Sequence, residues 1–291
     1  MQPPLSLCMI VKDEERNLPK CLDSVLALGP EIVIADTGST DRTIEIARQY
    51  GADIYPFSFE RVDFAAARNH TLAHATARWI LILDADEVLA PASVPLIQAV
   101  IADGEIAGYY FARRNHASDA EGFTTDYAVR LFPNRPDYRY RGRVHETVDA
   151  AILAGGGRLL TSGIVIDHNF VSGRETRRRK NRRYIEILKE EIEADPSDST
   201  RLDFLAAEFH QLEMFSEAAL VAEEIARLRP LDPMAHLNLG IYRLVYQTDP
   251  KRARAHFEQA LRLRPGYEEA LSFLRTIDEL ERAQPARADN A

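Results

Sequence analysis

Short apolar runs alternate with amphipathic stretches through the first part of the chain. Apolar runs of strand length predict buried strands, because a strand covered on both faces is apolar along its length. These runs lie at Leu5–Val11, Glu31–Ala35, Asp53–Phe57 and Trp79–Leu83, and later at Gly108–Arg113, Ala128–Phe132 and Ile164–Asp167. Apolar positions at helical spacing predict helices at Asn17–Ala27, Arg42–Tyr50 and Phe64–Thr76. The alternation indicates βαβ units and a mostly parallel sheet.

From about residue 176 the pattern becomes purely helical and repeats itself. Pro196, Pro230 and Pro265 are 34 and 35 residues apart, a period typical of tetratricopeptide repeats with proline at the repeat end. Each interval carries a predicted helix pair: Phe204–Leu212 with Glu217–Leu228, and Met234–Tyr246 with Lys251–Leu263. Small residues such as Gly240 stand where packed helices approach closely. Two repeats are too few for an independent solenoid, so we expect them to pack on the first domain or on a flanking helix at Glu268–Arg282.

These patterns divide the chain into four parts. We expect an α/β domain at residues 1–175, a basic linker helix at 176–195, tetratricopeptide-like repeats at 196–283 and a disordered tail at 284–291. Residues 174–183 hold seven basic side chains and one acidic one. This basic run is interpreted as a solvated helix start, or as a group of cations that meets a diphosphate or an anionic acceptor.

Composition and charge narrow the class of protein. The chain has 291 residues, of which 46% are apolar, and a formal charge of −9 from 36 basic and 45 acidic side chains. An acidic chain of this kind is not expected to bind nucleic acid as its main partner. Cys8 and Cys21 alone make no disulfide framework, which favours a reducing compartment. Because no apolar run is long enough to span a bilayer, we expect a cytoplasmic protein with at most peripheral membrane contact.

Three carboxylates follow the predicted strand Trp79–Leu83. Asp84, Asp86 and Glu87 stand at its carboxyl end, where open parallel sheets bind their ligands. Clustered carboxylates repel one another unless a cation lies among them, and oxygen ligands suit Mg²⁺ or Mn²⁺. The alternative is that they cap the next helix.

A second predicted strand also ends in an acidic residue. Asp36 precedes Thr37-Gly38-Ser39, and its carboxylate could accept a hydrogen bond from a base or a ribose. The alternative is an ordinary turn and helix N-cap. The segment lacks the spacing G-x-G-x-x-G, which disfavours a classical dinucleotide site.

Four ordered motifs carry a family resemblance. CMIVKDEERNLPKCLDSV, EIVIADTGSTDRT, DFAAARN and WILILDADE resemble, in order and spacing, the nucleotide-sugar glycosyltransferases of family two over residues 5–175. The resemblance implies the α/β GT-A fold, a Rossmann-like mixed sheet flanked by helices, followed here by an all-α tetratricopeptide-like domain. Cys-Met-Ile-Val-Lys at the start and Val-His-Glu later are similar to a bacterial subgroup that acts on lipopolysaccharide core and on peptides.

The resemblance also implies roles for individual residues. Asp86 is expected to bind the metal directly, with His168 completing the metal shell, although a lone histidine is often only hydrogen-bonded. Asp84 would face the ribose or metal-bound water. The residues expected to bind the nucleotide sugar are Val11, Glu14, Asp36, Arg68, Asn69 and Asp84.

The catalytic base is expected in the segment Gly142–Glu146. Inverting transfer needs a group that takes the acceptor's proton while the acceptor oxygen attacks the anomeric carbon. Glu146 is the candidate, with His145 as its competitor. The alternative for both is a structural pair at a strand end.

The favoured hypothesis is therefore an inverting, metal-dependent glycosyltransferase. It would move a sugar from a nucleotide-diphosphate sugar to a saccharide, lipid-linked or peptide acceptor, with Mg²⁺ or Mn²⁺ as cofactor. The resemblance implies UDP as the nucleotide, because uridine is the common base of the family. The repeats would position the acceptor or a protein partner. One alternative is an inactive adaptor of the same fold that binds a protein partner. Another is a nucleotidyltransferase, which would need a glycine-rich loop that Val11–Asn17 lacks.

Overall fold

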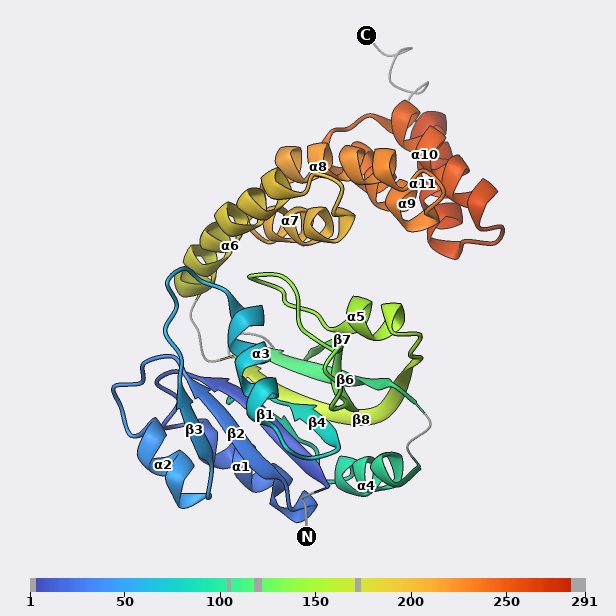
Figure 1. Ribbon diagram of the computed structural model, residues 1–291. Coiled ribbons are helices and arrows are strands. Elements are labelled where there is room, and N and C mark those ends of the chain that lie inside the picture. Colours follow the sequence, from blue (N-terminus) through green and yellow to red (C-terminus); the bar gives the residue numbers. More distant parts are fainter. Residues whose placement is uncertain (1–3, 104–105, 118–121, 171–173, 284–291) are drawn as a thin grey trace. The chain divides into compact units, whose positions relative to one another are not determined.

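The computed structural model describes residues 4–103, 106–117, 122–170 and 174–283. They form two compact units, Met1–Ser172 and Gly173–Ala291 (Figure 1). The helix expected as a linker at 176–195 is α6 (Arg174–Ala194), and it belongs to the second unit. The tail expected at 284–291 lies outside the described residues.

In the described residues, the first unit is built on a mixed sheet of eight strands in the order β3-β2-β1-β4-β7-β6-β8-β5. The strands are β1 (Leu5–Val11), β2 (Glu31–Asp36), β3 (Asp53–Pro56), β4 (Trp79–Ile82), β5 (Glu87–Leu89), β6 (Gly108–Ala117), β7 (Thr124–Pro133) and β8 (Leu159–Phe170). β1 to β4 run parallel, whereas β7 is antiparallel to both β4 and β6. β8 is parallel to β6 and antiparallel to β5. The sheet is mixed, as the resemblance implied, and less parallel than the alternation alone predicted.

Helices cover both faces of this sheet (Figure 1). Alternate side chains of β1 show the division: Leu7 and Met9 pack in the core shared with α1 (Leu18–Val25), α2 (Thr43–Gln49) and α4 (Ser93–Asp103). Cys8 faces the opposite core, shared with α3 (Phe64–His74) and α5 (Asp149–Ala154). A 3-10 turn at Leu26–Leu28 follows α1. Because both faces are buried there, β1, β2 and β4 are largely apolar along their length, as the pattern required.

The second unit is helical in its described part. It contains α6, α7 (Ser199–Gln211), α8 (Phe215–Leu228), α9 (Pro233–Ile241), a π-helical turn η2 (Tyr242–Tyr246), α10 (Pro250–Leu263) and α11 (Glu268–Ala283). The carboxylates of Asp198, Asp232 and Asp249 accept hydrogen bonds from backbone N–H groups in the first turns of α7, α9 and α10. These aspartates stabilise the first turns of the helices and so fix where each helix begins. The predicted helix 234–246 is interrupted, because its last five residues form the π-helical turn.

The helices of the second unit pack as the repeat predicts. α7 packs on α8, and α9 packs on α10. The flanking helix α11 covers the second pair, where the rings of Phe257 and Phe273 stack with centroids 5.1 Å apart. None of the helices in the described ranges is both long and apolar enough to cross a membrane.

Gly240 marks the closest approach of α9 and α10. A Cβ atom there would lie 2.6 Å from a ring carbon of Phe257, a side chain that is completely buried. The small residue is therefore required by packing, as the sequence indicated.

We predict that Gly240→Ala destabilises the second unit. Overpacking against a fixed ring costs about 1–3 kcal/mol, while alanine gains about 1 kcal/mol over glycine within a helix. The expected net loss is about 1 kcal/mol, measured by amide hydrogen exchange in α9 and α10. In the background of Phe257→Leu the same change should cost less. An equal loss in both backgrounds would show that the ring is not the obstacle.

Candidate active site

The segment after β4 folds into a tight turn that presents its carboxylates. The Asp84 N–H donates to Oε2 of Glu87 at 2.9 Å, and the Glu87 N–H donates to the Asp84 carbonyl at 3.0 Å. Cys21 on α1 donates its thiol to the same carbonyl at 3.4 Å. The turn is thus fixed by its own backbone and by the helix beneath it.

Asp84 lies between two arginines. Arg68 on α3 binds its Oδ1, and Arg130 on β7 donates to its Oδ2 at 3.2 Å. Burial by itself would raise the pKa of the Asp84 carboxyl, but Arg68 and Arg130 hold it well below its usual value. Asp84 is therefore an ionised anchor of the turn.

Glu87 is the most buried carboxylate of the turn, with a side-chain exposure of 0%. Its Oε1 accepts from Nη2 of Arg130, and Nη1 of Arg113 on β6 lies 3.5 Å away. Burial raises the pKa of Glu87 and the charge of Asp84 adds to this effect, while Arg130 opposes it. The sequence analysis gave no role to Arg113 or Arg130. Their one signal was an arginine within a predicted apolar strand, where a buried cation needs an acidic partner.

Arg68 joins the predicted base to the carboxylate turn. Its Nε donates to Oε1 of Glu146 at 3.1 Å, while its Nη2 holds Asp84. Helix α3 places Arg68 because Asp63 caps its start, accepting from the Ala66 N–H at 2.8 Å. Glu146 and Asp84, far apart in sequence, thus share one buried guanidinium.

The segment that carries Glu146 is tied to the start of α3. The Phe64 N–H donates to the Arg143 carbonyl at 2.8 Å, and Nε of Arg143 donates to the Val62 carbonyl at 2.9 Å. His145 has φ +50°, a left-handed conformation that non-glycine residues seldom adopt and that is found at functional sites. The structure therefore holds both candidate bases next to α3.

Asp86 and His168 form a pair at the outer side of the turn. Nε2 of His168 lies 3.2 Å from Oδ2 of Asp86, whose side chain is 32% exposed. β5 brings them together, because Glu87 pairs with His168 in the antiparallel ladder with β8. Among the described residues, no group of three or more His, Cys, Asp or Glu side chains could hold a metal ion. One carboxylate and one imidazole nevertheless fit a cation that takes its other ligands from substrate phosphates.

The residues predicted for the nucleotide lie at the ends of β1 and β2. Val11 is opposite Asp36 in the parallel register, and its carbonyl accepts from the Thr37 N–H at 3.0 Å. The Asp36 carboxylate accepts from the N–H groups of Gly38 and Ser39 at 3.2 and 3.1 Å. Asp36 therefore makes the turn that the sequence analysis kept as its alternative.

Glu14 lies near the carboxylate turn. Its carboxylate accepts from Nδ2 of Asn17 at 2.8 Å. Burial raises the pKa of Glu14, and Asp86 raises it further. Glu14 and Asp86 therefore lie close enough to interact electrostatically.

Asn69 binds backbone rather than the carboxylate turn. Its Nδ2 donates to the Tyr140 carbonyl at 2.9 Å, and its Oδ1 accepts from the Tyr140 N–H at 2.8 Å. This double hydrogen bond connects α3 to the chain segment that leads to Glu146.

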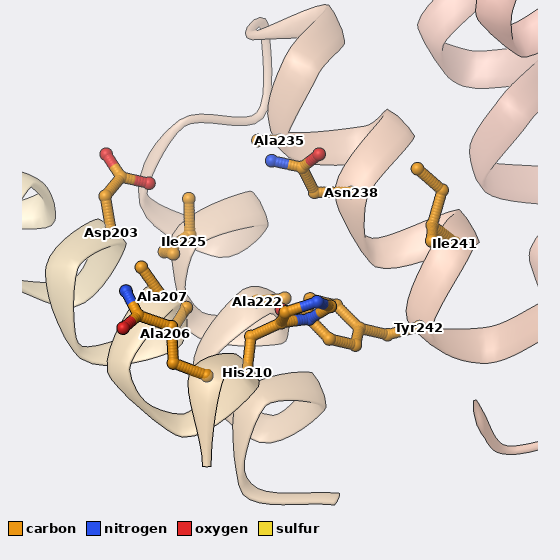
Figure 2. A pocket seen from close by; sticks show the side chains of 11 residues that line it. Asp203, Ala206, Ala207, His210, Ala222, Ile225, Ala235, Asn238, Ile241 and Tyr242 are labelled. Atoms are coloured by element: carbon orange, nitrogen blue, oxygen red, sulfur yellow. The ribbon is translucent and has the colours of Figure 1, made fainter. Parts of the chain in front are cut away.

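The second unit contains a groove of about 510 Å³ between α7, α8 and α9. Figure 2 shows Asp203 and His210 on one wall, and Asn238 and Ile241 on the other. The Tyr242 hydroxyl lies 3.3 Å from Nδ1 of His210. Burial raises the pKa of the Asp203 carboxyl, although Arg229 binds it at 2.6 Å. The groove combines apolar walls with hydrogen-bonding groups.

We predict that Arg130→Met destabilises the first unit by about 3 kcal/mol at neutral pH, because it leaves the buried Glu87 carboxylate with only the longer contact to Arg113, at 3.5 Å. Burial raises the pKa of Glu87 and Arg130 opposes that rise, so removing Arg130 raises the pKa further, and the folded variant keeps a proton on Glu87 at a pH where the unfolded chain has lost it. Stability from that proton is present at low pH and is lost as the pH rises through the folded pKa. The deficit of the variant should therefore shrink on acidification.

Amide hydrogen exchange in β4 and β7 would measure this effect. The matched control is Arg135→Met, which removes an exposed ion pair with Asp137 and should leave exchange unchanged. A deficit that does not vary with pH would contradict the assignment to Glu87.

Comparison with known proteins identifies the family. A model of the family described as Glycosyl transferase family 2 matches residues 6–168, more than half of the chain. A TPR repeat-containing protein of Synechococcus elongatus is 40% identical over 150 residues, 52% of this chain and 36% of that protein. The SPbeta prophage-derived glycosyltransferase SunS of Bacillus subtilis is 25% identical over 217 residues, 74% of this chain and 51% of that protein.

A solved structure is also similar along nearly the whole chain. The crystal structure of S. aureus TarS 1-349 in complex with UDP-GlcNAc matches with a TM-score of 0.48 and 15% identity, covering 98% of this chain and 92% of that one. The chain spans about half or less of the length of the two curated relatives. The family match confirms the resemblance carried by the four motifs: the chain belongs to glycosyl transferase family 2, and a tetratricopeptide-like helical region follows the matched residues.

Proposed function

We propose that the first unit transfers a sugar, with inversion, from a nucleoside-diphosphate sugar to a hydroxyl group of an acceptor, and that UDP is the nucleotide. The observation that carries the proposal is the pair of Asp86 and His168, 3.2 Å apart, next to a carboxylate turn that two buried arginines hold in place. This pair lies at the end of the sheet where α/β folds bind nucleotides.

Asp86 and His168 would hold a divalent cation, Mg²⁺ or Mn²⁺. When bound, the cation would neutralise charge on the departing diphosphate. The nucleotide would lie along the ends of β1 and β2, where Val11, Glu14 and Asp36 stand. Arg68 is buried behind Asp84 and Glu146, so we assign it the positioning of both carboxylates.

Glu146 would act as the general base. Its side chain is 15% exposed, and Arg68 fixes the carboxylate through Oε1. A carboxylate held in this way can take the proton of the acceptor hydroxyl while that oxygen attacks the anomeric carbon. His145, the residue before Glu146 in the chain, is the second candidate.

The groove in the second unit would hold a part of the acceptor, or of a protein partner. Its polar residues Asp203, His210 and Asn238 lie among apolar ones, as suits an extended peptide or saccharide. Saccharide, lipid-linked and peptide acceptors all remain within this proposal.

We predict that Asp86→Asn abolishes metal-dependent binding of the nucleotide. With wild-type protein, UDP at about 100 times its dissociation constant adds roughly 2.7 kcal/mol to the stability of the folded state. This stabilisation should require Mn²⁺ and be absent in the variant, as measured by thermal unfolding. The control Asp137→Asn changes an exposed aspartate of the same unit and should behave as wild type. If no nucleoside diphosphate stabilises the wild type, with or without metal, the result would favour the inactive adaptor.

We predict that Glu146→Gln keeps nucleotide binding and loses sugar transfer. Removing a general base lowers the rate by about 10²–10⁴-fold, which a transfer assay and the same unfolding measurement would separate. His145→Gln is the matched variant and should retain most of the transfer rate. Full turnover by Glu146→Gln would move the base to another residue, with His145 next.

A further inference from the structure

We propose that Asn115, on β6, fixes the tautomer of His168 so that the lone pair of Nε2 points to Asp86. Asn115 is thus a positioning residue for the candidate cation site, and this inference rests on the proposed function. The juxtaposition comes from the sheet, because Asn115 pairs with His168 across the parallel β6–β8 ladder.

Asp126, which Asn115 contacts besides His168, determines the orientation of the Asn115 amide. Its Nδ2 donates to Oδ2 of Asp126 on β7 at 3.2 Å. Asp126 is bound by Arg113 through two hydrogen bonds, of 2.9 Å from Nε and 2.8 Å from Nη2. Burial would raise the pKa of Asp126, but Arg113 lowers it below its usual value, so the carboxylate only accepts. The group of Asn115 that faces Asp126 must therefore be the amino group.

The carbonyl of Asn115 must then face His168. Oδ1 of Asn115 lies 2.8 Å from Nδ1 of His168. A carbonyl oxygen can only accept, so Nδ1 carries the proton. In the neutral imidazole the other nitrogen, Nε2, is then an acceptor.

In this tautomer of the neutral ring, two acceptors meet at the outer side of the turn. Nε2 of His168 and Oδ2 of Asp86 are 3.2 Å apart, so their contact becomes favourable only with a cation or a second ring proton between them. A histidine that binds a metal commonly donates its other N–H to a carbonyl or carboxylate, which orients the ring. Asn115 supplies that acceptor here.

Arg113 connects this group of residues to the carboxylate turn. Arg113, which orients Asp126, also lies 3.5 Å from Oε1 of Glu87. One arginine on β6 thus contacts both the residue that orients Asn115 and the turn that carries Asp86. Strand β6 therefore contacts both His168, through Asn115, and the turn that carries Asp86, through Arg113 and Glu87.

The first test is the tautomer of His168. Long-range ¹H–¹⁵N NMR spectra of protein labelled at histidine, assigned with His168→Gln, report which ring nitrogen carries the proton. We expect Nδ1–H as the only ring proton in the metal-free wild type, and Nε2–H as the only proton, or protons on both nitrogens, overturns the inference whatever the metal does.

The second test is Mn²⁺ binding in the presence of UDP, measured by calorimetry. Asn115→Leu should weaken Mn²⁺ binding by about 10- to 100-fold. The double variant Asn115→Asp/Asp126→Asn exchanges the acid and the amide and keeps an acceptor towards His168, so it should recover most of the affinity. Thr124→Val, at the exposed partner of Asn115 on β7, is the control and should bind as wild type.

The outcomes separate the two proposals. Equal Mn²⁺ affinity of Asn115→Leu and wild type, or a double variant as weak as Asn115→Leu, overturns the role of Asn115. A wild type that shows Nδ1–H on His168 but binds no Mn²⁺ with UDP supports the role of Asn115 in fixing the ring and contradicts the proposed metal site.

Discussion

The pairing of buried charges around Arg68 and Arg130 is the constraint on which the site depends. Three carboxylates, Asp84, Glu87 and Glu146, share these two guanidiniums. Charges that are buried away from water must be paired with good geometry. Removal of one partner leaves the remaining charges buried without compensation. Helix α3, strand β7, the turn after β4 and the segment 141–147 are therefore fixed relative to one another. No one of these elements can shift without breaking a buried ion pair.

This arrangement gives the carboxylates different roles. Asp84 and Glu87 neutralise the arginines and shape the turn, while Asp86 points to His168 at its outer side. Glu146, fixed by Arg68, stands on the other side of the same guanidinium. A candidate cation site and a candidate base are thus connected through one arginine. Their separation is set by rigid elements, as transfer between two bound substrates requires.

Much of the fold followed from the sequence, because the central strands β1, β2 and β4 are largely apolar along their length and the helical region repeats with a regular period. The carboxylate turn was also predictable, since acidic residues at a strand end are a local pattern. The contacts of Arg130 and Asn115 were not predictable: an arginine in an apolar strand indicates a buried acidic partner without naming it, and nothing local marks the contact between Asn115 and His168. Helix α4 was missed because its sequence, SVPLIQAVIAD, is apolar on most sides and contains a proline. Asn69 lay in a recognised motif, but only the structure shows that it binds the Tyr140 backbone.

The position of a bound metal ion tests this account most directly. Crystals grown with UDP and Mn²⁺ would reveal the ion through its anomalous scattering. The account predicts a peak between Oδ2 of Asp86 and Nε2 of His168, with Asp84 still bound to Arg68 and Arg130. A peak on Asp84, with its arginine contacts broken, would contradict the division of roles within the turn.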